Sequence, residues 1–191
     1  YGVVTKRLLP NADLTADRFH VELQARRALD ELRTIIQDEA KCSHTNLKKL
    51  LWFNESQLDY HEKIKLELAF KKYSRYPILK QAWVIKEQII QIYWAQSEAE
   101  ARKQFEHVMM LLETCDNSHY LEVLHRTLKR WKQPILNYFK NKTTNGFTEG
   151  CHTKIKMIKR VSFGFRNIDH YIAKITLAFL PLIWILNYHT N

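Results

Sequence analysis

Two acidic residues of this chain have neighbours that suit chemistry on phosphate groups. Asp17 follows residues 12–16, a short run that predicts a strand, and it precedes a segment with helical spacing. Glu149 stands between the break at residues 143–146 and a segment rich in Lys and Arg. Carboxylates hold divalent cations, and cationic side chains hold a nucleic-acid strand near them. Each acid alone also has a structural explanation, since Asp17 could cap a helix and Glu149 could interact with a helix dipole.

Positive charge is concentrated around Glu149. The chain has a formal net charge of +10, which exceeds what solubility needs and favours a polyanionic partner. Glu149 is the only acid between Lys129 and Arg166, beside ten basic residues: Lys129, Arg130, Lys132, Lys140, Lys142, Lys154, Lys156, Lys159, Arg160 and Arg166. This segment predicts a surface that contacts polyphosphate, with a solvated basic face as the alternative.

A helix over residues 148–161 would separate charged from apolar side chains. At about 100° per residue, Glu149, Lys156 and Arg160 fall within about 40° of one another, with His152 and Lys159 beside them. The opposite side is apolar and is predicted to pack, and it comprises Cys151, Ile155, Ile158 and Val161. One stripe of this helix therefore presents a carboxylate followed by cations.

The rest of the sequence predicts helices almost throughout. Apolar residues recur at helical spacing between breaks. This pattern predicts that residues 1–9 are the end of a helix and that further helices cover residues 21–37, 47–53, 56–76, 78–95, 97–112, 119–139 and 168–179. Ser56 and Ser97 are the predicted N-caps of two of them. A lone strand at residues 12–16 cannot make a sheet. Either that strand is absent, or its partners belong to sequence outside this chain.

Composition limits the class of protein. A chain of 191 residues that is 46% hydrophobic makes one globular domain or slightly more. Three cysteines imply no disulfide framework, which favours a reducing, cytoplasmic compartment. The apolar run over residues 175–186 contains Pro181 and is too short to span a bilayer, so we expect no membrane partner. The tryptophans are predicted to pack in the core, although exposed ones could stack on bases.

Two motifs together resemble DDE transposases of prokaryotic insertion sequences. The first is Asp-Arg-Phe-His-Val at residues 17–21. The second is Thr-Asn-Gly-x-x-Glu-Gly at residues 144–150, followed by Lys-x-Lys-x-x-Lys-Arg at 154–160 and Gly-Phe-Arg-Asn at 164–167. The resemblance covers residues 1–179, is strongest over residues 145–167, and is to the C-terminal part of such enzymes.

The resemblance implies an α/β fold and a metal-dependent reaction. Such transposases have a ribonuclease-H-like core in which three carboxylates bind two divalent ions, Mg²⁺ or Mn²⁺. The second carboxylate would be Asp17 and the third Glu149, while five cations would contact DNA: Lys154, Lys156, Lys159, Arg160 and Arg166. The partners would be double-stranded DNA, at the element ends and the target, and further copies of the enzyme in a homo-oligomer.

The resemblance also divides the chain into four parts. Residues 1–38 would end the ribonuclease-H-like core, with an incomplete sheet, and residues 39–143 would be a helical insertion. Residues 144–179 would form the C-terminal catalytic and basic helices, leaving residues 180–191 as an unassigned apolar tail.

One catalytic acid of the family pattern has no counterpart here. Only Asp13 is acidic among the residues before Asp17, and it lies too close to serve as the first carboxylate. We therefore expect this chain alone to be inactive in DNA cleavage. Two other function classes fit the composition, a non-catalytic helical nucleic-acid-binding protein and a protein of the membrane surface.

Overall fold

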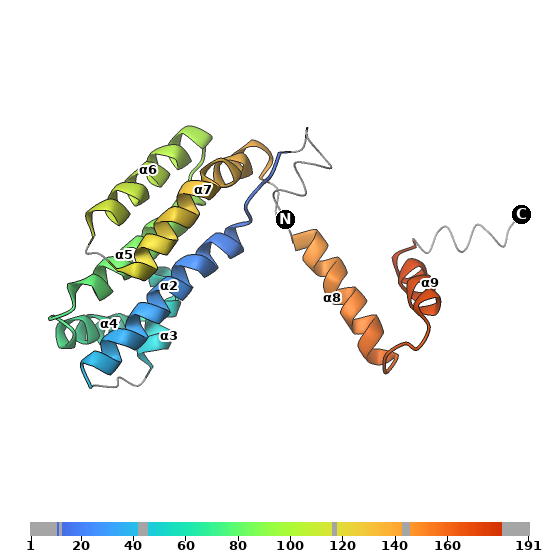
Figure 1. The fold of residues 1–191 in the computed structure, drawn as a ribbon, viewed down its shortest axis with the longest axis horizontal. Helices are drawn as coiled ribbons and strands as arrows, with labels where there is room; N and C mark the ends of the chain where they lie inside the picture. Colours follow the sequence, from blue (N-terminus) through green and yellow to red (C-terminus); the bar gives the residue numbers. More distant parts are fainter. Residues whose placement is uncertain (1–10, 12, 42–45, 116–117, 143–145, 181–191) are drawn as a thin grey trace, which may run out of the picture. The chain divides into compact units, whose positions relative to one another are not determined.

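The described part of the chain is almost entirely helical and divides into two compact units. The structure is a computed structural model that describes residues 11, 13–41, 46–115, 118–142 and 146–180. The division falls between Thr143 and Thr144, so unit 1 is Tyr1–Thr143 and unit 2 is Thr144–Asn191 (Figure 1). Each unit is described by itself. The predicted helix within residues 1–9 and all but the first residue of the predicted tail lie outside the described residues.

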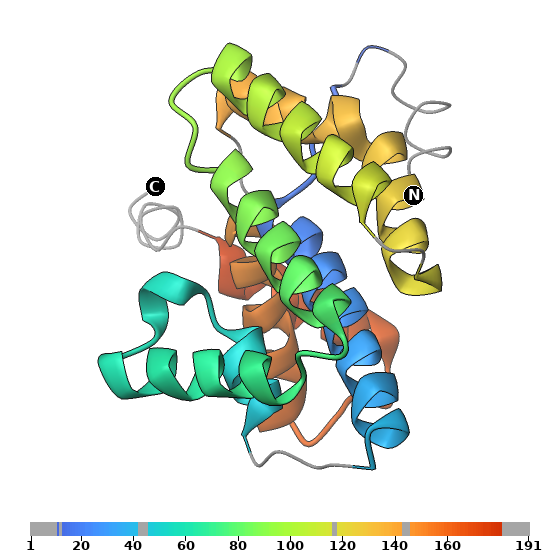
Figure 2. The ribbon, with the colours of Figure 1, turned by 90° about the vertical axis from the view of Figure 1, so that its left-hand side faces the viewer.

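Four long helices of unit 1 surround one hydrophobic core. They are α2 (Arg18–Glu39), α5 (Pro77–Ile92), α6 (Glu98–Thr114) and α7 (His119–Asn141). Helix α2 packs against α5 and α7, and α6 packs against the same two helices, which closes the arrangement (Figure 1). Three shorter elements, α3 (Leu47–Trp52), η1 (Glu55–Gln57) and α4 (Tyr60–Lys72), complete the unit, with α4 running across the long helices in Figure 2.

The apolar spacing of the sequence explains this core. Helix α2 buries Val21, Ala25, Leu29, Leu32 and Ile36, which recur every three or four residues and therefore share one face. The other long helices present comparable stripes to the same core. Burying each large aliphatic side chain stabilises the fold by about 1.5–3 kcal/mol before entropy is subtracted.

Local sequence signals set the ends of several helices. Ser97 caps α6 as predicted, because its hydroxyl accepts a hydrogen bond of 3.2 Å from the Glu100 amide. The predicted cap at Ser56 is wrong. Asp59 caps α4 instead, since its carboxylate accepts from the Glu62 amide at 2.8 Å and the Glu62 carboxylate accepts in return from the Asp59 amide at 3.3 Å. Pro77 occupies the first turn of α5, where its missing N–H costs nothing.

The strand predicted over residues 12–16 is wrong for its described residues, 13–16, which belong to no strand or helix. Their backbone groups bond to helices instead: the Ala16 amide donates to the Pro134 carbonyl at 2.9 Å, and the Asn137 side chain donates to the Leu14 carbonyl at 2.9 Å. These bonds satisfy the polar backbone without a neighbouring strand. The segment therefore docks along α7, directly before α2 begins.

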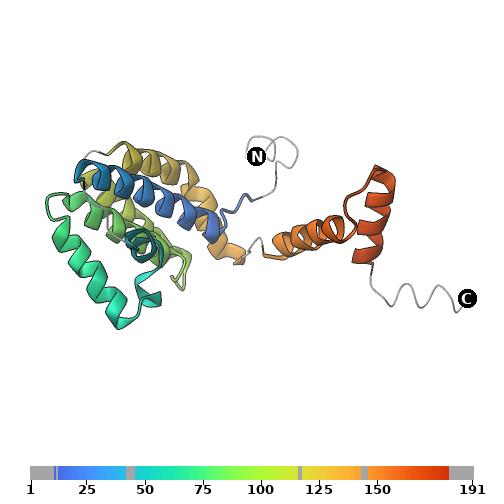
Figure 3. The same cartoon turned by 90° about the horizontal axis from the view of Figure 1, so that it is seen from below.

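Unit 2 is a hairpin of α8 (Gly146–Val161) and α9 (Ile168–Phe179), visible at the right of Figure 3. Predicted and observed bounds agree closely for both helices. The chain turns at Phe163, which has a left-handed φ of 52°, and at Gly164, with a φ of 90°. The Gly164 amide bonds to the Lys159 carbonyl at 3.0 Å and the Phe163 amide to the Arg160 carbonyl at 3.1 Å, which is a Schellman ending of α8.

The apolar side of α8 packs only in part. Cys151, Ile155 and Ile158 are half-buried, as predicted, whereas Val161 is 65% exposed and the prediction of packing at this residue is wrong. Among the residues of the hairpin whose burial the structure describes, none is fully buried. Two helices alone cannot cover both of their apolar faces, so the hairpin contains no core of its own.

Candidate catalytic and nucleic-acid-binding site

Asp17 lies at the N-cap of α2, directly after the segment of residues 13–16. Its backbone is extended, with φ −65° and ψ 137°, and its Oδ1 accepts a hydrogen bond of 2.7 Å from the Phe19 amide. Asp17 therefore caps α2, which agrees with the structural role that the sequence allows for it. Capping fixes the position of the carboxylate, so it is compatible with a second role.

A buried ion cluster anchors the first turns of α2 next to Asp17. Glu22 is only 5% exposed and lies between two arginines, 2.6 Å from Arg18 Nε and 2.9 Å from Arg26 Nη2. Arg26 also donates to the Asn54 side chain at 3.0 Å, which ties α2 to the segment after α3. Because a buried carboxylate needs such partners, this cluster holds both arginines in defined positions.

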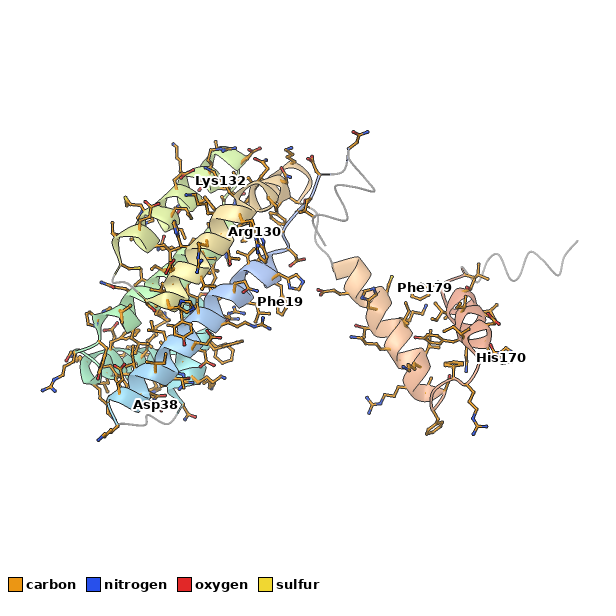
Figure 4. All side chains as sticks on the ribbon, viewed as in Figure 1. Phe19, Asp38, Arg130, Lys132, His170 and Phe179 are labelled. Carbon is orange, nitrogen blue, oxygen red and sulfur yellow. The ribbon has the colours of Figure 1, made fainter. Side chains whose placement is uncertain are left out.

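Glu149 lies in the first turn of α8 and its side chain is exposed. Its backbone carbonyl accepts from the Thr153 hydroxyl at 2.9 Å. A carboxylate in the first turn interacts favourably with the partial positive charge of the helix N-terminus. Figure 4 shows side chains projecting along α8, which is a regular helix from the turn of Glu149 onward.

The five predicted DNA-binding cations share unit 2 with Glu149, but they are not equivalent. Lys154 donates to the Ala178 carbonyl, and its ammonium lies 4.6 Å from the ring centroid of Phe179 at the end of α9 (Figure 4). All five are exposed, but for the other four, Lys156, Lys159, Arg160 and Arg166, no comparable contact with α9 is recorded within residues 146–180. Within residues 146–180, none of these four forms an ion pair with a carboxylate. Lys154 thus holds the hairpin together, while the others remain open to an anionic ligand.

The basic segment of the sequence is divided between the two units. Its first half lies on α7 in unit 1, where Lys132 pairs with Glu106 at 2.5 Å and Lys140 pairs with Asp13 at 3.3 Å. Figure 4 labels Lys132 and Arg130 on α7. Pairing lowers the net charge of that half. The strongest unpaired positive charge among the described residues of the segment is therefore on α8 and its C-terminal turn.

The donor chemistry of the two acids suits Mg²⁺ or Mn²⁺, which prefer carboxylate oxygens. Asp17 belongs to unit 1 and Glu149 to unit 2. Within the described ranges, no three His, Cys, Asp or Glu residues gather as a ready metal site. The ligand type therefore fits a divalent ion, and any complete coordination shell needs further groups.

Sequence comparison identifies the family of the chain. The family model DDE_Tnp_ISL3, described as "Transposase", matches residues 1–175. The chain belongs to this transposase family. The match includes Asp17, Glu149 and the four exposed cations, and it confirms the resemblance to an insertion-sequence transposase.

Two curated transposases are similar to the chain. The transposase for insertion sequence element IS1001 of Bordetella parapertussis is 25% identical over 177 residues, which cover 89% of this chain and 43% of the relative. The transposase for IS1557 of Mycobacterium tuberculosis (strain ATCC 25618 / H37Rv) is 27% identical over 207 residues, covering 94% of this chain and 45% of the relative. The chain thus spans less than half the length of these relatives. No solved structure gives a significant match.

Two residues of unit 1 have a burial that the sequence did not predict. Lys86 is fully buried, and its ammonium donates to the Leu51 and Phe53 carbonyls at 2.9 and 2.6 Å. Burial lowers the pKa of Lys86, although Glu87, at 2.6 Å, acts in the opposite direction.

Trp94 was predicted to pack and is 58% exposed, so that prediction is wrong. The helix predicted over residues 78–95 included Trp94, whereas α5 ends at Ile92 and leaves this residue beyond the helix.

Proposed function

We propose that this chain is part of a DDE-type DNA transposase that cleaves and transfers DNA strands with the help of divalent metal ions. The observation that carries the proposal is the family match over residues 1–175, which contains both candidate carboxylates. Double-stranded DNA, at the ends of an insertion sequence and at its target, is then the substrate. The resemblance also implies that several copies of the enzyme assemble on that DNA.

We propose a ribonuclease-H-like core for the complete enzyme, interrupted by a helical insertion. Residues 39–143 would be the insertion, which agrees in character with the helices from α3 to α7. Helix α2 would belong to the core and pack against the insertion. The segment of residues 13–16 and the incompletely buried hairpin of α8 and α9 would then contact parts of the core outside this chain.

Asp17 and Glu149 would be the metal-binding acids. They would hold Mg²⁺ or Mn²⁺, which would supply activation of a water or a DNA 3′-hydroxyl and stabilisation of the leaving oxygen. The Phe19 amide would orient the Asp17 carboxylate through its hydrogen bond to Oδ1. The start of α8 would hold Glu149, and the packing of α8 on α9 would keep that helix in place.

The cations of unit 2 would bind the DNA backbone. Lys156, Lys159, Arg160 and Arg166 are exposed and would neutralise phosphates near Glu149. Lys154 would add charge from its position against α9, where its ammonium meets Phe179. Because these contacts involve phosphates, they would position DNA without selecting its sequence.

The test is strand cleavage by the transposase that contains this chain, on a labelled duplex with an end of its element. We expect cleavage with Mg²⁺ or Mn²⁺ and none after chelation, while binding to the duplex persists. Binding without cleavage under every metal condition would instead support a non-catalytic nucleic-acid-binding protein.

A further inference from the structure

Trp94 is the most exposed tryptophan among those that the structure describes. It follows the last turn of α5 and is 58% exposed, whereas Trp83, within α5, is 8% exposed. Trp52 and Trp131 are half-buried. A large indole that remains in solvent is available to a ligand with a flat apolar face.

A hollow of about 240 Å³ lies beside this ring. Its walls are mainly aromatic and cationic, and they include Arg18, Tyr93, Trp94, Tyr138, Phe139 and Lys142. Ring contacts make the wall rigid, because Tyr93 lies 5.2 Å from Tyr138 and 6.3 Å from Phe139 between centroids. No lining residue is acidic. The composition therefore suits a ligand that is both planar and anionic.

Both chain neighbours of Asp17 contact this hollow or its wall. Arg18 lines it, and the Ala16 carbonyl accepts a hydrogen bond of 3.2 Å from the Tyr93 hydroxyl. Burial, with the Asp17 carboxylate acting in the same direction, raises the pKa of Tyr93, so this phenol stays a donor at all ordinary pH values. The hollow is thus adjacent to the proposed metal-binding carboxylate within unit 1.

Arg18 is held in place at the edge of the hollow. Its Nε lies 2.6 Å from the buried Glu22 carboxylate, and its Cζ lies 5.8 Å from the ring centroid of Trp94. The ion pair uses Nε, and among the described residues the two terminal nitrogens make no hydrogen bond, so they can donate to another acceptor. Lys142, which also lines the hollow, is exposed. Two cations therefore line the hollow together with the aromatic rings.

We propose that Trp94 and its hollow bind one unpaired DNA base, while Arg18 and Lys142 hold the adjoining phosphates. This inference rests on the proposed function, and it makes Trp94 a positioning residue for the strand on which Asp17 would act. The volume is below the roughly 300–1,000 Å³ of sites for drug-sized ligands, which suits a single base. A base stacks on an aromatic ring whatever its identity, so the site orients a strand without reading its sequence.

A second, larger hollow lacks the pair of cations and the position next to Asp17. It measures about 460 Å³, lies at the opposite end of α5 beside Pro77, and is lined mainly by apolar and aromatic side chains. Because α5 rises about 1.5 Å per residue over sixteen residues, that hollow is far from Asp17. The hollow at Trp94 is the one that a strand held near Asp17 could enter.

The test measures DNA binding by the 191-residue chain in a metal chelator, so that no catalytic step contributes. The probes are a blunt duplex and the same duplex with a short unpaired extension, followed by fluorescence anisotropy. The variants are Trp94→Ala, Trp94→Phe and the control Tyr60→Ala, which removes another exposed aromatic ring of unit 1, 75% exposed on α4. Thermal melting verifies that each variant folds.

We expect the wild-type chain to bind the extended duplex about ten-fold more tightly than the blunt one, the order expected for one base–aromatic stack. Trp94→Ala should lose this preference, while Trp94→Phe and Tyr60→Ala keep most of it. Equal binding of the two probes by the wild type, or an unchanged preference in Trp94→Ala, overturns the inference and leaves the proposed function standing. A wild-type chain that binds neither probe contradicts both.

Discussion

Lys86 shows how a single buried charge joins two elements of unit 1. Its side chain is inaccessible to solvent and donates to the carbonyls of Leu51 and Phe53, at the end of α3. These carbonyls have no partner within their own short helix. Lys86, on α5, therefore supplies the C-terminal cap of α3 and fixes it to the bundle.

Replacing Lys86 by Met should destabilise the chain by about 3 kcal/mol, because two carbonyls lose their hydrogen-bond donor and the Glu87 carboxylate loses its ion-pair partner while the volume hardly changes. Chemical denaturation measures the loss. Lys80→Met is the matched control, since Lys80 is on the same helix with its side chain 53% exposed. Equal stability of the two variants would show that the buried ammonium contributes nothing.

Asp30 gives a pH dependence of known sign. Burial alone would raise its pKa, but hydrogen bonds from Lys48 and Arg33, each 2.7 Å away, outweigh burial and lower the pKa from 3.8. A carboxylate with a lowered folded-state pKa contributes stability that is complete above 3.8 and is lost as the pH falls through the folded value.

Asp30→Asn should therefore lower the free energy of unfolding at neutral pH. The further loss of stability as the pH falls should be smaller in this variant than in the wild type. Denaturation midpoints measured between neutral pH and the acid range test this expectation. Asp38→Asn, at an exposed position of the same helix labelled in Figure 4, should keep the wild-type decline. The prediction fails if Asp30→Asn and the wild type lose stability in parallel.

Helix α8 is the element on which DNA binding depends in our proposal. Substituting Lys156, Lys159 and Arg160 together by Ala should weaken binding to all DNA sequences. The slope of log affinity against log salt should fall by about three, since each phosphate contact contributes about 0.9. Titrations at several salt concentrations measure the slope.

A matched variant separates a local surface from general charge. Lys63, Lys65 and Lys103 are exposed in unit 1, and their joint substitution by Ala removes the same charge. Their loss should change the slope much less. If both triple variants reduce the slope equally, binding depends on net charge and α8 has no special part in it.

The sequence was informative about helices and much less so about the segment before Asp17. Period and capping residues predicted α6 at Ser97 and the bounds of α9, because those signals are local. The short run before Asp17 lies between breaker residues and predicted a strand, yet its hydrogen bonds go to Pro134 and Asn137, more than one hundred residues away. Such tertiary partners override a local preference and leave no trace in a window of sequence.

The candidate site shows the same contrast. Residue types identified Asp17, Glu149 and the cations, and helical phase placed Glu149 on one helix with Lys156 and Arg160. Neither signal could show that Lys154 bonds to α9 or that Trp94 is exposed, because both depend on which helix lies beside the residue. The charge pattern is a local property, whereas the contacts of each charge are not.

At the scale of the whole molecule, the two units differ in how complete they are. Unit 1 has a core to which every long helix contributes, whereas the described residues of unit 2 include none that is fully buried. No helix within the described ranges is long and apolar enough to cross a membrane. In our proposal, unit 2 gains stability by burying its apolar faces on the catalytic core of the transposase.

The most direct measurement of the central proposal is metal-dependent DNA cleavage by the transposase containing this chain, with Asp17→Asn and Glu149→Gln. Asparagine caps a helix as well as aspartate does, and glutamine has the shape of glutamate, so both variants should fold while losing a metal-binding charge. Asp169→Asn, in the exposed first turn of α9, is the control. We predict that each of the first two variants binds DNA but does not cleave it, while the control cleaves like the wild type. Wild-type cleavage by Asp17→Asn or Glu149→Gln would contradict the assignment of that residue as a catalytic metal ligand.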